Sequence, residues 1–222
     1  MSRPDFSIIK PLKVDAFSKT DLALYEGQKV IVRTLDHGKV WENVVARWLA
    51  RRERNILRRL NNLNSPHLPR LLYSDRNTLI RSYIGGTPLI DAGKQSSKFY
   101  EQALEVIAQM HGLGVIHNDL EKPENWIVQE DGTPGIIDFQ IAMHMSGQKN
   151  YFFKRLSFED VRHTLKNKNR YCVDKLTPEE AVLKDRRSAL NRFWRYGFKP
   201  VYNFITRKIF NYSDRASSQY SN

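Results

Sequence analysis

The residues that decide the fold lie between positions 117 and 139, where the sequence reads HNDLEKPENWIVQEDGTPGIIDF. The Asp-Gly pair at 131–132 stands between two short apolar runs, a pattern that predicts a β-hairpin. Because a hairpin brings its two ends together, we expect Asn125 and Asp138 to be neighbours, with Asp119 in the loop just before them. Two carboxylates and an amide oxygen are hard ligands that suit Mg²⁺ or Mn²⁺, and one carboxylate is left to act as a base. The stretch therefore predicts a metal-assisted reaction centre.

This stretch resembles the catalytic loop and metal-binding motif of protein kinases, HxDxxxxN followed by DFG. From about Val30 onward, most of the chain is similar to compact bacterial protein-kinase-like phosphotransferases, akin to the RIO-type and lipopolysaccharide-core (Kdo/heptose) kinases. Further pieces that carry the resemblance are Arg52-Glu53, the run from 159 through 172, and the aromatic, basic C-terminus. The resemblance implies an α+β, two-lobed protein-kinase-like fold, with a small β-rich N-lobe that holds one long helix and a mainly helical C-lobe.

The resemblance also implies the chemistry. The cofactors would be ATP and Mg²⁺ or Mn²⁺, and the γ-phosphate would move to a hydroxyl acceptor. That acceptor would be a protein Ser/Thr side chain or a lipopolysaccharide-core sugar, and the resemblance allows both.

Individual roles follow where this sequence matches the motif. Asp119 would be the catalytic base that orients the acceptor hydroxyl, and Asn125 and Asp138 would hold the metal ions that bridge the phosphates. Glu53 would pair with a cation on the strand before its helix. The residue pattern supports this last role independently, because Glu53 shares an apolar helical face, where a carboxylate is costly without a partner. His117 is interpreted as a structural residue that orients the loop.

The strand cation departs from the family pattern, because Arg33 stands where kinases have Lys. Arginine keeps its charge, but its planar fork is bulkier and binds phosphate differently. Lys29 lies four residues earlier, on the same face of a regular strand, and is the alternative phosphate-binding cation. Arg33 thus motivates a second hypothesis, a pseudokinase that binds ligands without turnover.

Three more departures concern the loops. Asn125 is six residues after Asp119, and Glu124 occupies the usual place of the metal ligand. We favour Asn125 because the following strand determines its register, and Glu124 stays an alternative. Gln140 replaces the Gly of DFG, and no G-x-G-x-x-G precedes the strand of Arg33, so the segment 13–20 would cover the phosphates.

The predicted lobes are an N-lobe at 1–80, a connector at 81–88 that would line the adenine site, and a C-lobe at 89–222. Apolar periodicity and β-branched runs predict the elements. In the N-lobe these are strands at 22–25, 30–32, 71–73 and 78–80 and a helix from 41 to 60. In the C-lobe they are a helix over 100–111, a strand pair around 126–137, and helices that begin at capping boxes at 157–160 and 177–180. The arginine-rich face at 47–59 is interpreted as solvated.

Charge points to an anionic partner. The 222 residues carry a net charge of +12, which favours nucleotide, nucleic acid or an acidic membrane surface as a ligand. Nine Lys/Arg and two Asp lie between 184 and 215, a net +7 within a basic aromatic helical segment at about 177–215. Three interpretations stay open for this segment: packing on the C-lobe, peripheral contact with an anionic membrane, and nucleic-acid binding. An RNA- or ribosome-associated protein is the third functional hypothesis.

The sequence also predicts the compartment. A single cysteine, Cys172, excludes an intramolecular disulfide and is typical of a reducing environment. The N-terminus shows no signal-peptide core, and no stretch approaches about 18 apolar residues, the length that spans a membrane. We therefore expect a cytoplasmic protein, with peripheral contact at the inner face of the membrane as the variant that the basic segment suggests.

Overall fold

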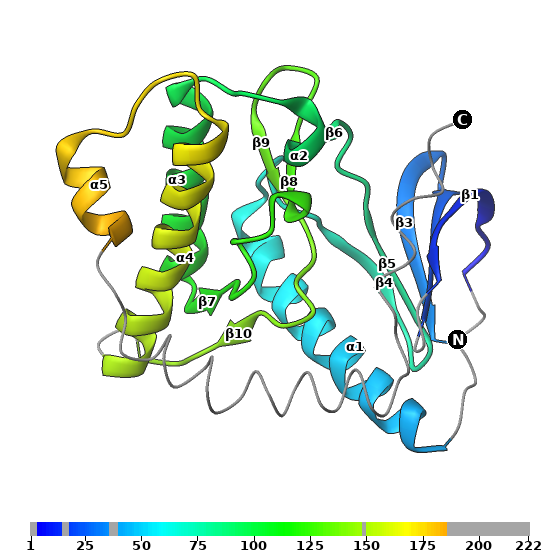
Figure 1. Cartoon of the computed structure of the whole chain (residues 1–222). Coiled ribbons are helices and arrows are strands. Elements are labelled where there is room, and N and C mark those ends of the chain that lie inside the picture. Colours follow the sequence, from blue (N-terminus) through cyan, green and yellow to red (C-terminus); the bar gives the residue numbers. More distant parts are fainter. Residues whose placement is uncertain (1–3, 15–17, 36–39, 148–149, 186–222) are drawn as a thin grey trace. The chain divides into compact units, whose positions relative to one another are not determined.

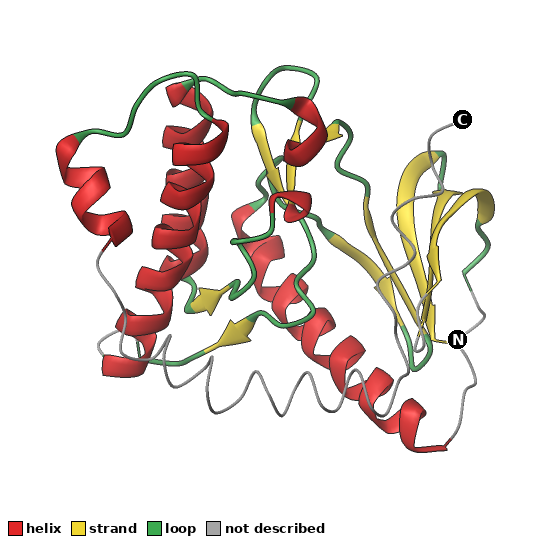
Figure 2. Ribbon diagram, in the orientation of Figure 1, coloured by secondary structure: helices red, strands yellow, loops and turns green. Residues whose placement is uncertain are grey.

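The computed structural model describes residues 4–14, 18–35, 40–147 and 150–185. Figure 1 shows a β-sheet formed by the N-terminal residues and a helical part formed by the later ones, and Figure 2 shows the same division by element type. The antiparallel sheet has the order β1-β2-β3-β5-β4. Its strands are β1 (Ser7–Val14), β2 (Ser18–Tyr25), β3 (Gln28–Leu35), β4 (Leu71–Ser74) and β5 (Thr78–Ser82).

The centre of this sheet confirms the predicted strands. β2 and β3 form a tight hairpin whose two turn residues, Glu26 and Gly27, both have positive φ, at 50° and 75°. Such a turn matches the right-handed twist of the flanking strands. Ala23, Val30 and Val32 pack with Ile80 of β5 into a small buried cluster. Because successive side chains of a strand point to opposite faces, Ile31 and Arg33 of β3 lie on the face opposite Val30 and Val32.

Strand β1 was not among the predicted elements. Its sequence SIIKPLKV lacks the apolar-polar alternation that marks a half-buried strand. The structure agrees, because all eight of its residues are exposed. Strand β1 pairs antiparallel with β2, and at one end of the pair Lys13 lies opposite Thr20 and Val14 opposite Lys19. Residues 15–17, the middle of the segment predicted to cover the phosphates, lie outside the described residues.

The long helix of the N-terminal part is α1 (Val40–Leu60), as predicted. Ile56, Leu57 and Leu60 of its C-terminal half are buried in the main core. That core also holds residues of the helical part, including Phe99 and Trp126. Helix α1 therefore contacts both the sheet and the helical part. Its side chains can reach residues of either part.

Two long helices, α3 (Ser97–Gly112) and α4 (Tyr151–Tyr171), lie side by side in the helical part (Figure 1). The shorter elements around them are α2 (Leu89–Ala92), α5 (Pro178–Asp185), η1 (Asn61–Leu63), η2 (Pro123–Asn125), β6 (Thr87–Pro88), β7 (Val115–Ile116), β8 (Trp126–Val128), β9 (Pro134–Ile136) and β10 (Met143–His144). Strands β8 and β9 form the hairpin that the Asp-Gly pair predicts.

One predicted helix start was wrong. Helix α4 begins at Tyr151, and Asn150 caps it by accepting a hydrogen bond from the backbone N–H of Phe152. Ser157, predicted as the cap, lies inside the helix and donates its hydroxyl to the carbonyl of Lys154. The residues before Ser157 carry no helix-breaking signal, and burial of Phe153 helps to extend the helix backward.

The second capping box is confirmed. The backbone N–H of Thr177 donates to Oε2 of Glu180, and the backbone N–H of Glu180 donates to Oγ1 of Thr177. This is the reciprocal pair that the sequence pattern requires. The rest of the predicted basic segment, from residue 186 onward, lies outside the described residues. No helix in the described ranges is long and apolar enough to cross a membrane.

The predicted connector runs from the end of β5 through a short loop to β6, which pairs with β8. Gly86 has a φ of 135°, and a Cβ at this position would overlap the carbonyl oxygen of Val128. A Cβ on Gly135 would overlap the buried side chain of Ile84 in the same way. Two glycines therefore let the connector lie directly on the β8–β9 hairpin.

Candidate active site

The loop that follows β7 is anchored by His117, which has no exposed surface. Its Nε2 lies 3.0 Å from the carbonyl oxygen of Ile137, and its Nδ1 accepts a hydrogen bond of 3.3 Å from the backbone N–H of Asp119. Its ring contacts the ring of Phe139 edge to face, at 4.7 Å between centroids. His117 thus holds the loop against the segment that contains Asp138, in keeping with the predicted structural role.

Asp119 and Asn125 lie together. The amide nitrogen of Asn125 donates to the backbone oxygen of Asp119 at 2.9 Å and to its Oδ2 at 3.0 Å. Lys122 Nζ also donates to that Oδ2, at 2.7 Å. Glu124, the alternative metal ligand, is exposed, whereas Asn125 is buried. Since the nitrogen of Asn125 is engaged by Asp119, its amide oxygen is the atom left for a cation.

A backbone hydrogen bond places Asp138 close to Asn125. The N–H of Ile137 donates to the backbone oxygen of Asn125 at 2.9 Å, so the two predicted ligands lie at the joined ends of the β8–β9 hairpin. Asp138 has a φ of 66°, and Asn118 beside Asp119 has the same value. Non-glycine residues with positive φ are uncommon and cluster at functional sites, where the surrounding structure holds them in place.

The predicted ion pair between strand and helix is present. Arg33 Nη1 lies 2.7 Å from Glu53 Oε2, and the two side chains are 5% and 4% exposed. Arg33 Nε also donates to Ser18 Oγ at 2.9 Å. The alternative cation, Lys29, is exposed near the other end of β3. Within the described part of the chain, Glu53 pairs with Arg33 and Arg81 and forms no ion pair with Lys29.

Arg81 is a functional candidate that the sequence analysis missed. Its Nε lies 3.8 Å from Glu53 Oε1 at the end of β5. Burial lowers the pKa of Arg81, and the nearby negative charges of Glu53 and Asp138 partly oppose that effect. The guanidinium therefore lies in the field of both acids and connects the ion pair with the predicted metal ligand. An arginine that ends an apolar strand gave no signal for this role in the sequence.

Arg52, the neighbour of Glu53, connects α1 with the loop after Asp138. It donates from Nε to the carbonyl of Ala142 at 2.7 Å and from Nη2 to that of Ile141 at 3.0 Å. The adjacent residues Arg52 and Glu53 thus contact two different segments of the site. The position of α1 therefore affects the strand cation and the Asp138 loop together.

Asp160 of α4 anchors the loop of Asp119 by hydrogen bonds and has no exposed surface. Its Oδ2 accepts from the backbone N–H of His117 at 2.8 Å, and its Oδ1 accepts from that of Asn118 at 2.9 Å. His111 Nε2 lies 3.1 Å from the same carboxylate. The sequence pattern predicted a capping box that includes Asp160, whereas the carboxylate of Asp160 binds His117 and Asn118, more than 40 positions away in the chain.

The donor set fits a metal that is shared with a nucleotide. Among the described residues, no group of three or more His, Cys, Asp or Glu is placed to hold a metal ion. Mg²⁺ usually keeps waters and binds through one or two carboxylates together with substrate phosphates. One amide oxygen and one carboxylate, on Asn125 and Asp138, match that requirement better than a site built from protein ligands alone.

Comparisons with known proteins found kinases among the sequence relatives and the solved structures. No family model matches the chain. A protein of Encephalitozoon cuniculi described as a probable cAMP-dependent protein kinase catalytic subunit is 31% identical over 157 residues, which cover 64% of this chain and 48% of that protein. Sperm motility kinase Z of Mus musculus is 30% identical over 156 residues, 65% of this chain and 30% of the kinase. The chain spans less than half the length of these curated relatives.

Among solved structures, the Rio2 kinase from Chaetomium thermophilum aligns with a TM-score of 0.56 and 17% identity, over 86% of this chain and 69% of the kinase. The fold is therefore protein-kinase-like, of the α+β type with a β-rich N-terminal part and a helical part, as predicted. The sequence relatives named above are also kinases.

Proposed function

We propose that the chain is an ATP-dependent phosphotransferase that moves the γ-phosphate of ATP to a hydroxyl acceptor. The observation that supports it best is the convergence of Asp119 and Asn125 in one loop, beside Asp138 at the joined hairpin end. The buried Arg33–Glu53 pair supplies the cation that such a site needs near the nucleotide phosphates.

Each side chain then has a defined task. Asp119 accepts the proton of the acceptor hydroxyl and orients it toward the phosphate. Asn125 and Asp138 would hold Mg²⁺ or Mn²⁺ through their oxygens, and the metal would neutralise charge that develops on the phosphates. Lys122, whose Nζ is 2.7 Å from Asp119, places a positive charge beside the base, where an approaching phosphoryl group would meet it.

Arg33 is suited to the phosphates in spite of the departure from lysine. Its Nη1 and Nε are used by Glu53 and Ser18. Within the described ranges its Nη2 has no hydrogen-bond partner, so this nitrogen is left to donate to a phosphate oxygen. Lys29 is a second cation on the same strand. Glu53 keeps Arg33 in place, because a buried arginine needs a carboxylate to offset the loss of hydration.

For the acceptor we propose a Ser/Thr hydroxyl on a protein, because the relatives include proteins described as serine/threonine-protein kinases. A lipopolysaccharide-core sugar is the other acceptor that the chemistry allows. Transfer of labelled γ-phosphate to a general Ser/Thr acceptor protein and to a core saccharide, assayed in parallel, separates the two.

The primary test is thermal unfolding with ATP, with and without Mg²⁺ or Mn²⁺, for the wild type and Asp138→Asn. Saturation at about 100 times Kd adds about 2.7 kcal/mol of stability, which for a domain of this size raises Tm by about 5–11 °C. We expect a metal-dependent shift that Asp138→Asn abolishes. Asp131→Asn, an exposed position in the turn of the same hairpin, is the matched control and should keep the shift. No shift at millimolar ATP would refute nucleotide binding.

Arg33 also favours a second candidate, a kinase-like protein that binds the nucleotide without turnover. Arginine in place of lysine changes how the strand cation meets the phosphates. Arg33→Lys should then produce phosphotransfer that the wild type lacks. An active wild type would eliminate this candidate.

A further inference from the structure

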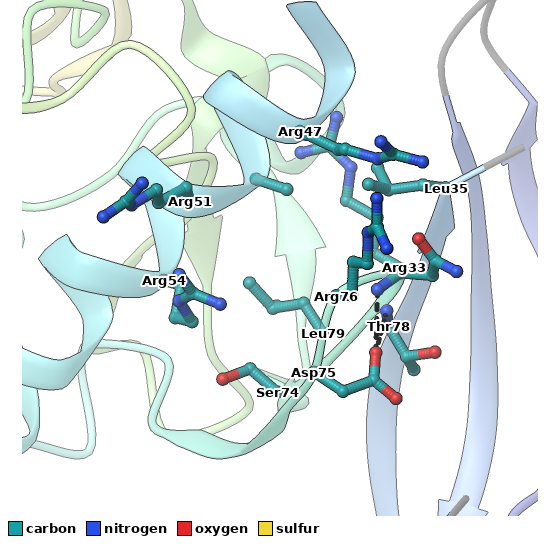
Figure 3. A pocket seen from close by; sticks show the side chains of 12 residues that line it. Arg33, Leu35, Arg47, Arg51, Arg54, Ser74, Asp75, Arg76, Thr78 and Leu79 are labelled. Carbon is teal, nitrogen blue, oxygen red and sulfur yellow. Dashed lines mark hydrogen bonds between the residues drawn. The ribbon is translucent and has the colours of Figure 1, made fainter. Parts of the chain in front are cut away.

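A second positively charged site lies away from the loop of Asp119. A pocket of about 160 Å³ opens between α1, the end of β3 and the turn that joins β4 to β5 (Figure 3). Its charged lining residues are Arg33, Arg47, Arg51, Arg54, Asp75 and Arg76. Asp119, Asn125 and Asp138 do not line it. The pocket is therefore distinct from the candidate active site, although the two share Arg33.

The positive charge of this pocket is poorly compensated. In Figure 3 the side chains of Arg47 and Arg54 extend from α1 toward the strands. Across the described part of the chain, Arg47, Arg51, Arg54 and Arg76 have no carboxylate within ion-pair distance. Among the described residues that line the pocket the one acid is Asp75, and its carboxylate is occupied in its own turn, where it accepts two backbone N–H bonds at 2.8 and 2.7 Å.

Arg54 gives the clearest indication that the pocket accepts a ligand. Its Nε is buried and has no hydrogen-bond partner among the described residues. A buried donor without a partner costs free energy that an acceptor in the pocket would recover. Burial lowers the pKa of Arg54, and the like charges of Arg58 and Arg51 lower it further. An anion bound beside Arg54 would offset the repulsion between these like charges.

The size of the pocket limits what it can hold. At about 160 Å³ it is smaller than the roughly 300–1,000 Å³ that sites for drug-sized ligands occupy. It suits one compact charged group. Arginine forks bind oxyanions through parallel N–H bonds, and phosphate oxygens fit them especially well.

We propose that this pocket binds a phosphoryl group and that its occupancy stabilises the placement of α1 at the candidate active site. Arg47, Arg51 and Arg54 lie on one face of α1, and Arg54 directly follows Glu53, the partner of Arg33. A phosphoryl group held between this face and Arg76 of the β4–β5 turn would bridge α1 to the sheet. That bridge would favour the position in which Glu53 meets Arg33 and Arg52 holds the carbonyls after Asp138.

Binding is tested on the full chain without nucleotide. Inorganic phosphate is titrated by calorimetry at constant ionic strength, with chloride as the replacement anion. We expect saturable binding that Arg47→Gln/Arg54→Gln weakens at least about tenfold, since each lost guanidinium removes charge-assisted hydrogen bonds. Arg58→Gln/Arg59→Gln removes the same charge from exposed positions of the same helix and should leave the affinity within about twofold. Equal weakening by both pairs, or no saturable binding, would overturn the proposal.

The source of the phosphoryl group is distinguished by a second ligand. A short phosphoserine peptide that competes with phosphate and binds more tightly would identify a phosphorylated side chain as the occupant. A peptide that binds more weakly than phosphate would identify the free ion. Either conclusion requires that Arg47→Gln/Arg54→Gln loses the binding. Competition that persists in that variant would place the peptide at another site and overturn the assignment of the phosphoryl group to this pocket.

The coupling of the two sites rests on the proposed function and has a separate readout. Phosphate at saturation should tighten the binding of Mg²⁺–ATP by at least about fivefold, and ATP should tighten phosphate binding by the same factor. The Arg47→Gln/Arg54→Gln variant should lose this effect. Phosphate binding without any ATP binding would defeat the proposed function and leave the pocket in place. Independent binding of both ligands would overturn the coupling alone.

Discussion

Replacement of Glu53 by glutamine is the perturbation that the structure predicts most sharply. Glutamine has nearly the same volume as glutamate, so Glu53→Gln removes charge and leaves no cavity. The change would leave Arg33, 5% exposed, and Arg81, 13% exposed, without their carboxylate at 2.7 and 3.8 Å. Breaking a buried ion pair by removal of one partner costs about 3–5 kcal/mol. For a domain of this size the cost corresponds to a fall in Tm of about 6–20 °C.

The assay is urea unfolding followed by tryptophan fluorescence and circular dichroism. The matched control is Glu121→Gln, because Glu121 also pairs at 2.7 Å, with Lys166, but is 61% exposed. An exposed pair contributes about 0–1 kcal/mol. The double variant Arg33→Met/Glu53→Leu removes both members of the main pair and should recover at least about half of the loss. If Glu53→Gln costs no more than Glu121→Gln, the inference that burial makes this pair indispensable is wrong.

Two further predictions concern the helical part. Asp160→Asn should lower the free energy of unfolding by about 2–3 kcal/mol in the same urea assay. The reason is that an amide nitrogen would replace one of the two carboxylate oxygens that accept backbone N–H bonds. A loss below about 0.5 kcal/mol would contradict the anchoring role. Burial lowers the pKa of His163, as do Arg162 and Lys166, while Glu121 opposes the shift. The unfolded chain therefore binds a proton more readily, so stability should fall as pH drops through about 6.5; His163→Gln should reduce the difference between pH 7.5 and pH 5.5, and an unchanged difference would assign the acid sensitivity to other groups.

The candidate site was predictable where its signals are local. The Asp-Gly pair at 131–132 predicted the β8–β9 hairpin, and the hairpin by itself brings Asn125 near Asp138. The capping box at 177–180 formed as its four residues require. Glu53 on an apolar helical face predicted a cationic partner, and Arg33 meets it across 20 positions. These features depend on contacts within one element or on a single electrostatic requirement.

Other features were missed because their cause lies outside the segment that carries them. Strand β1 has no buried face, so its pairing with β2 rather than its own pattern makes it a strand. Asp160 looked like part of a helix start, but its carboxylate accepts bonds from a loop more than 40 residues earlier. The arginine face at 47–59 was interpreted as solvated, which holds for the exposed Arg58 and Arg59. Arg47, Arg51 and Arg54 instead line a pocket together with the β4–β5 turn.

The sequence by itself therefore determined the kinase-like loop and hairpin, the order of the main elements and the need of Glu53 for a cation, because turn chemistry, periodicity and charge compensation act over short distances or between few groups. Only the tertiary structure decided that Arg81 joins the ion pair, that Asp160 holds the loop of Asp119, and that arginines of α1 meet the β4–β5 turn. Burial and the partners of a charge are properties of packed neighbours, and the packing that brings those neighbours together is not written in any one segment of the chain.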